Sequence, residues 1–181
     1  MATKKTLKDV FQAALDKWEW SDKIEHDDSD DTDYISTDYS IDQQKYRLVI
    51  FTDERTRDIV INLYSPIIIP PDRQNAGAFL MNFFNSGLRA SGSIMMSPDG
   101  KVVYKNSTNV SGTSASVEQF EKLKARAGGI FESETQRTRA IGAVAFTKQS
   151  IESIIEDFLS SLDGEQELSD DEANSDIPDK L

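Results

Sequence analysis

The chain has 181 residues, a formal net charge of −12, one histidine and no cysteine. This length suits one domain with a core of its own. The absence of cysteine excludes disulfides, thiolate catalysis and cysteine-based zinc sites, and the acidic balance argues against nucleic acid as a partner.

The first predicted element is an amphipathic helix close to the N-terminus. Thr6 is placed to cap this helix, and Asp9 lies in its first turn. The apolar residues recur at steps of three and four, which is the period of a helix with one buried face: Leu7, Val10, Phe11, Ala14, Leu15 and Trp18. Segment 22–33 follows with seven acidic residues and one lysine, and we interpret it as an acidic surface loop.

The acidic segment also holds the only histidine, His26. A Ser-His-Asp arrangement would have to use this residue, and a solvated loop histidine is the preferred interpretation. The acids from Asp28 onward are those of a calcium loop, but Asp33 stands where the turn glycine belongs and Tyr39 where the bidentate glutamate belongs. We expect no catalytic residue, no cofactor and no metal site; weak association of a divalent cation with the acids remains an open alternative.

The next part of the chain predicts an antiparallel meander of three strands. Its runs are rich in β-branched and aromatic residues and are separated by polar turns: 34–41, 45–52 and 58–64. In the middle run, Val49 and Phe51 alternate with Leu48, so both faces of this strand carry apolar side chains. Helices covering only one face would leave apolar area that a partner could bury.

Pro70 and Pro71 end the third strand, and Pro71 suits the first turn of a helix. The apolar residues of that helix form one arc on a helical projection: Ala76, Phe79, Leu80, Phe83, Phe84 and Gly87. Its asparagines fall outside the arc, and Asn85 is expected where the helix ends. Two strands joined by the turn "SPDG" then predict a hairpin.

The C-terminal part predicts helices and a tail. Ser116 and Gln119 form the pattern of a capping box at the start of one helix. A last helix, about residues 149–159, carries an apolar face of Ile151, Ile154, Ile155, Phe158 and Leu159. We expect residues 1–162 to form the domain and the acidic tail 163–181 to be disordered, because it has little apolar surface to bury.

The stretch "FLMNFFNSGLRASGSIMMSPDGKVVYKN", with a helix and a meander before it and helices after it, resembles the YbjN-like family. Proteins of that family are described as bacterial sensory transduction regulators, and their fold is similar to that of type III secretion chaperones. The resemblance spans about Leu7 to Phe146. It implies an α+β binding fold that is often dimeric and has no established catalytic residues.

The expected fold is therefore α+β, type III secretion chaperone-like, with an antiparallel sheet of about five strands and helices packed on one face. The expected function is that of a cytoplasmic, non-enzymatic protein-binding or chaperone-like regulatory adaptor that forms a homodimer and binds neither nucleic acid nor membrane. The candidate partner-binding residues are Ile151, Ile155 and Phe158. Two alternatives stay open: a regulator whose acidic tail competes for a basic partner, and an enzyme that uses carboxylates.

Overall fold

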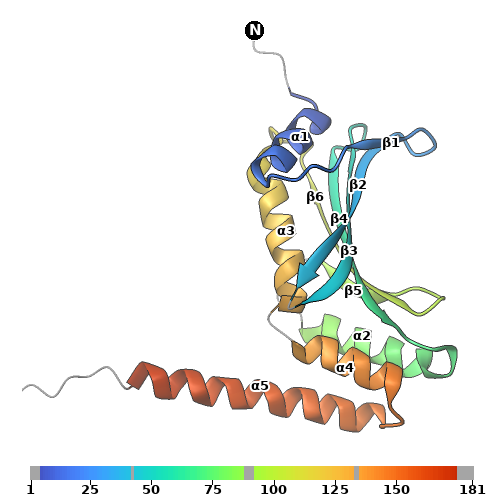
Figure 1. Ribbon diagram of the computed structural model, residues 1–181, viewed down its shortest axis with the longest axis vertical. Helices are drawn as coiled ribbons and strands as arrows, with labels where there is room; N and C mark the ends of the chain where they lie inside the picture. Colours follow the sequence, from blue (N-terminus) through green and yellow to red (C-terminus); the bar gives the residue numbers. More distant parts are fainter. Residues whose placement is uncertain (1–4, 42, 88–91, 133–134, 175–181) are drawn as a thin grey trace, which may run out of the picture.

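The computed structural model describes residues 5–41, 43–87, 92–132 and 135–174, with residues 132, 135 and 163–174 described through their backbone alone. Six antiparallel strands form one sheet in the order β1-β2-β3-β4-β6-β5 (Figure 1). The strands are β1 (Glu25–Asp27), β2 (Thr32–Ile41), β3 (Gln44–Asp53), β4 (Asp58–Ile68), β5 (Ser93–Met96) and β6 (Lys101–Asn109). The helices are α1 (Leu7–Lys17), α2 (Gln74–Gly87) after a 3₁₀ turn η1 (Pro71–Arg73), α3 (Val117–Glu132), α4 (Thr135–Phe146) and α5 (Ile151–Asn174).

The core lies between one face of this sheet and the helices. Ile50 of β3 is in register with Ile35 of β2 and Ile61 of β4, and all three are almost fully buried. Helices α1 and α3 run along this face, while α2, α4 and α5 gather at one end of it (Figure 1). The predicted α+β fold with helices on one face of an antiparallel sheet is confirmed, with six strands in place of about five.

The two predicted helix starts agree with the structure. The Thr6 hydroxyl accepts a hydrogen bond from the Asp9 amide, and the Asp9 carboxylate accepts one from the Thr6 amide, which completes a capping box. At the start of α3, the Ser116 amide donates to the Gln119 side chain over 2.8 Å. Helix α4 was not predicted, because half of its apolar residues are small alanines and its apolar stripe is weak.

The acidic segment 22–33 is not a loop throughout, which corrects the prediction. Its residues Glu25–Asp27 form β1 and pair with residues 32–34 of β2. The Tyr34 hydroxyl donates to the Glu25 carboxylate over 2.7 Å, and the Lys8 ammonium lies 2.7 Å from Asp33. These contacts from outside the segment offset part of the repulsion among its carboxylates, so the chain can pair here as a short hairpin.

The last helix is also longer than predicted. Helix α5 continues past residue 163 to Asn174 and so extends into the segment that was expected to form the acidic tail. Residues 175–181 lie outside the described part of the chain. The segment after residue 163 contains glutamate, leucine and alanine, which favour a helix, and it has no proline until Pro178. Local propensity therefore explains the continuation. In Figure 1 this part of α5 projects away from the domain.

Truncation after Asp163 should leave the melting temperature nearly unchanged. A helix that projects from the domain adds local hydrogen bonds but little buried apolar area, and most helix stability in proteins comes from packing. Thermal unfolding followed by circular dichroism checks this expectation, with full-length protein at the same concentration as the control. A fall of several degrees would show that the tail packs on the domain.

Asn85 has a different role from the helix end assigned to it by sequence. Helix α2 continues to Gly87, and the Asn85 side chain makes two hydrogen bonds of 2.8 Å, one to the amide and one to the carbonyl of Ile94. The backbone amide and carbonyl of Ile94, in the edge strand β5, are thus bonded by a side chain of the helix. In the middle of a sheet, the backbone of a neighbouring strand would make such bonds. This pairing joins α2 to the edge of the sheet.

Candidate protein-binding surface

The three residues predicted to bind a partner lie on the part of α5 that packs on the domain, but in different surroundings. Phe158 is buried at 8% exposure, and its ring lies 5.1 Å from that of Phe84 and 6.0 Å from that of Phe83. Ile151 and Ile155 are half-buried at the edge of this cluster. Phe158 therefore attaches α5 to α2, and the side chains next to it are the ones that a partner can reach.

Helix α2 presents two apolar faces rather than the single one predicted. Leu80, Met81 and Phe84 are buried in the core, whereas Phe79 is 58% exposed. The apolar arc predicted for this helix is too wide for one neighbour to cover. On a helical projection, Phe79 and Phe83 lie at one edge of the arc and Phe84 lies at the other. Phe83 is used in the contact with α5, and Phe79, one turn earlier, stays in solvent.

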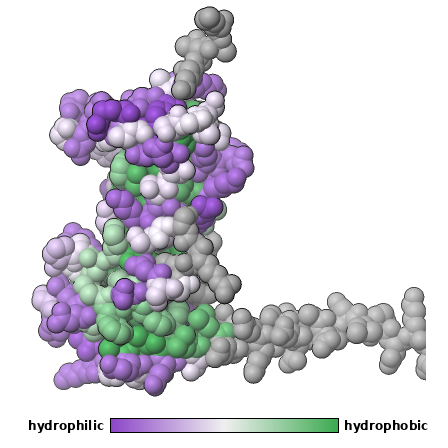
Figure 2. All heavy atoms as spheres, turned by 180° about the vertical axis from the view of Figure 1, so that it is seen from behind, coloured by the Kyte–Doolittle hydropathy of each residue, from purple (hydrophilic) through white to green (hydrophobic). Residues whose placement is uncertain are grey.

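Helix α5, which contacts α2 through Phe158, carries a further exposed apolar side chain. Leu159 is 45% exposed and follows Ile155 by one turn. We call Phe79 and Phe83 of α2, together with Ile155 and Leu159 of α5, the α2–α5 surface. In Figure 2 hydrophobic side chains gather over the end of the molecule where these two helices lie. Sequence analysis placed Leu159 on the apolar face but did not select it, and it treated Phe79 as core.

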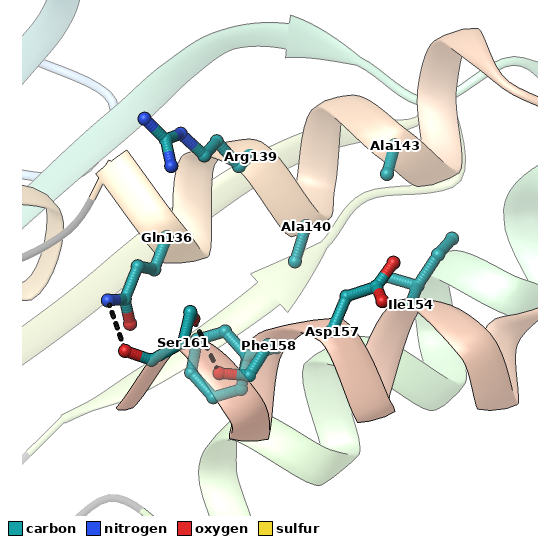
Figure 3. A pocket seen from close by; sticks show the side chains of 8 residues that line it. All are labelled: Gln136, Arg139, Ala140, Ala143, Ile154, Asp157, Phe158 and Ser161. Atoms are coloured by element: carbon teal, nitrogen blue, oxygen red, sulfur yellow. Dashed lines mark hydrogen bonds between the residues drawn. The ribbon is translucent and has the colours of Figure 1, made fainter. Parts of the chain in front are cut away.

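A pocket of about 230 Å³ lies on the other side of α5, against α4 (Figure 3). Ala140 and Ala143 of α4 face Ile154 and Phe158 of α5 across it. The Gln136 side chain donates a hydrogen bond of 3.2 Å to the Ser161 carbonyl and joins the two helices at one end. The small alanines leave the space open, so the pocket is an apolar hollow with a polar rim.

The face of the sheet away from the helices is the second surface predicted to be open. Val49 and Phe51 of β3 are half-buried there, and Arg47 is exposed. Arg47 donates to the Ser36 hydroxyl over 2.7 Å and lies 3.9 Å from Asp38. Because charged side chains with partners interrupt its apolar residues, this face offers less continuous apolar area than the α2–α5 surface.

His26 lies in a carboxylate-rich corner of the β1–β2 hairpin. Its Nδ1 is 3.2 Å from Asp33, and its Nε2 is 3.5 Å from Asp28 and 3.8 Å from Asp31. Within the described residues, no group of three or more histidine, cysteine or acidic side chains has an arrangement that could hold a metal ion. The described ranges also contain no helix long and apolar enough to cross a bilayer.

Comparison with known proteins finds no matching family model and no matching curated protein. The chain is similar to the solved structure of YbjN from E. coli, at 13% identity and a TM-score of 0.47, over 72% of this chain and 89% of that chain. It is also similar to a chain of the ExsC–ExsE complex, at 11% identity and a TM-score of 0.45, over 71% and 96% of the two chains.

A further similar structure is the type III secretion chaperone SycH from Yersinia pestis, solved with a fragment of YscM2. Its identity is 11% and its TM-score 0.41, over 65% of this chain and 89% of that chain. The likeness is one of fold. Both groups that the sequence resemblance named, YbjN and the type III secretion chaperones, are among the structures to which this chain is similar.

Proposed function

We propose that the chain is a non-enzymatic protein-binding adaptor and that it forms a homodimer through the α2–α5 surface. The observation that carries this proposal is the exposure of two large apolar side chains on adjacent helices, Phe79 at 58% and Leu159 at 45%. Each Å² of apolar surface removed from water contributes about 25 cal/mol, and contiguous exposed apolar patches mark interaction sites.

A second copy of the chain suits this surface for a physical reason. A twofold interface brings the same patch of each protomer together, so an uncharged patch avoids the repulsion that a charged one would meet. Phe79, Ile155 and Leu159 carry no charge, and the neighbouring acids Glu152 and Glu156 are exposed. These acids would lie at the rim, where salt screens them, so added salt should strengthen the dimer.

The non-enzymatic part of the proposal rests on the surroundings of the one histidine. Within the described residues, the hydrogen-bond and ion-pair partners of the His26 ring nitrogens are carboxylates, and no hydroxyl nucleophile is hydrogen-bonded to them. A nucleophile and its base must lie within hydrogen-bond reach of each other. Robust turnover of a common substrate class, lost on one point substitution, would contradict this part of the proposal.

A second candidate function is a regulator whose acidic tail competes for a basic partner. The continuation of α5 through acidic residues to Asn174, away from the domain, favours it (Figure 1). Truncation after Asp163 separates the two candidates. The homodimer should persist in the truncated chain, whereas binding of a basic partner through the tail would be lost.

The dimer is tested by a charge placed on its proposed interface. Leu159→Glu should raise the dimer dissociation constant at least about tenfold, because the carboxylate would be desolvated between two apolar surfaces. Ile155→Glu should act in the same direction. Ser160→Glu is the matched control, since Ser160 is the next residue of the same helix, is exposed and points away from the surface. Light scattering over a concentration series measures the mass of each variant.

Two outcomes would contradict the dimer. A strictly monomeric mass of the unaltered chain at high protein concentration would exclude it. Equal weakening by Leu159→Glu and Ser160→Glu would assign the effect to charge on α5 rather than to the α2–α5 surface. Circular dichroism of Leu159→Glu separates loss of the dimer from loss of the fold.

A further inference from the structure

The two tryptophans of the chain surround a lysine ammonium. Trp18 ends α1 and Trp20 follows two residues later, with ring centroids 5.0 Å apart. The Lys124 Nζ of α3 lies 4.2 Å from the centroid of the Trp18 ring and 4.9 Å from that of the Trp20 ring. Tyr39 of β2 extends the cluster, with its ring 6.4 Å from that of Trp20. Both indoles thus contribute to cation–π binding of one ammonium.

The backbone fixes the position of these rings. Glu19, between the tryptophans, has a φ of 57°, which is uncommon for a residue other than glycine. The Trp18 amide donates to the Ala14 carbonyl and the Trp20 amide to the Leu15 carbonyl, over 3.1 and 3.0 Å. These bonds turn the chain sharply after α1 and place both indoles on the same side of α3, so the cluster is preformed.

The Lys124 ammonium is held by the rings rather than by an acid. Among the described residues, no carboxylate lies within 4.0 Å of its Nζ. The nearby Glu121 is engaged with Lys17 at 2.7 Å. Burial lowers the pKa of Lys124, and the charge of Glu121 opposes that shift. A lysine that is partly desolvated and has no ion pair is easily displaced, because only the weak attraction of the rings holds its flexible stem.

A hollow of about 420 Å³ opens beside the cluster, between residues 19–22 and β2. Lys124, Trp20 and Tyr39 line it together with three acidic residues, Glu19, Asp22 and Asp38. The lining therefore carries three carboxylates and a single ammonium. Aromatic walls with an acidic rim are the surroundings that stabilise an organic cation.

We propose that this is a binding site for the ammonium group of a lysine side chain on a protein partner, and that Lys124 occupies it as an internal competitor. When the partner's ammonium enters, the Lys124 side chain swings into solvent and the incoming cation takes its place over the indoles. The site lies on α1, β2 and α3, away from the α2–α5 surface, and it does not depend on the homodimer.

The test uses the full-length chain and its intrinsic fluorescence. Trp18 and Trp20 are the only tryptophans, so the emission reports on this site alone. The probes are a blocked tripeptide with a central lysine, the same peptide with trimethyllysine, and free choline. The lysine peptide should give a saturable change, and trimethyllysine a tighter one, because its cation is more weakly hydrated. A response to choline but to neither peptide would overturn the assignment to a protein partner.

Variants of the lysine and of the rim make the test specific. Lys124→Ala should bind the lysine peptide about tenfold more tightly, because the internal competitor is gone. Lys124→Met keeps an unbranched apolar stem without the charge, and it replaces Lys124→Ala in this test if the alanine variant fails to fold. Asp22→Asn and Asp38→Asn should each weaken binding several-fold, whereas Asp30→Asn, in the exposed β1–β2 turn, makes the same change of charge away from the hollow and should have no effect.

No saturable fluorescence change with any probe, in the unaltered chain or in the Lys124 variants, would overturn the proposal. Equal affinity of the unaltered chain and Lys124→Ala for the lysine peptide would overturn the role of Lys124 as a competitor. Light scattering of Lys124→Ala should give the same mass as the unaltered chain, so this result is independent of the test of the homodimer.

Discussion

Replacement of Phe158 by alanine should destabilise the domain by about 3–5 kcal/mol, the usual cost of removing a buried phenylalanine ring. The ring is 8% exposed and packs between Phe83 and Phe84, so its loss would leave a cavity between α5 and α2. It also contributes to the wall of the pocket against α4 (Figure 3). The two helices that carry the proposed interface would thus lose their main contact.

Leu159→Ala is the matched control for this prediction. Leu159 is the next residue on the same helix and is 45% exposed, so its truncation should cost less than about 1 kcal/mol in the monomer. Urea denaturation at equal, low protein concentration measures both variants. Equal losses would contradict the assignment of Phe158 to the core and of Leu159 to the surface.

Gly100→Ala should destabilise the domain by about 3 kcal/mol or more, since it combines backbone strain with a steric clash. Gly100 has a φ of 81°, and a Cβ built on it would lie 2.0 Å from the Ile69 carbonyl oxygen. The Ile69 amide donates to the Gly100 carbonyl over 2.9 Å. The substitution would push apart the turn before β6 and the chain that leads from β4 into α2.

Gly112→Ala is the control for this second prediction. A Cβ at Gly112 meets nothing within 4 Å, so its effect should stay within about 1 kcal/mol. For a chain of this size, a loss of 3 kcal/mol corresponds to a fall in melting temperature of about 6–12 °C. Thermal unfolding of both variants measures the difference. A Gly100→Ala protein as stable as the unaltered chain would show that the hairpin can move away from Ile69.

Local sequence patterns were sufficient to predict the elements that are stabilised by contacts between residues close in sequence. The Thr6 cap with Asp9 in the first turn, the strand alternation around Ile50 and the "SPDG" turn that ends at Gly100 all appear as predicted. In each case, the interaction that stabilises the element joins residues close in sequence, or follows from a period of two along a strand.

The parts that were missed depend on long-range contacts or on weak signals. Strand β1 pairs within an acidic segment, supported by Lys8 of α1 and the Tyr34 hydroxyl of β2. Helix α4 has only three large apolar residues, Ile141, Val144 and Phe146, beside its alanines. The apolar residues of α5 were recognised, but periodicity alone does not tell which of Ile155, Phe158 and Leu159 is covered, because that depends on where α2 lies.

The candidate sites depend on tertiary structure more than the fold does. The sequence by itself determined that α2 and α5 carry apolar stripes and that neighbouring tryptophans lie near the end of α1. Only the packing decided that Phe158 is buried while Leu159 is exposed, and that Lys124 lies over the indoles of Trp18 and Trp20. Hydrophobic burial is proportional to area and has no direction, so a stripe of side chains does not specify which neighbour covers it until the helices and the sheet are assembled.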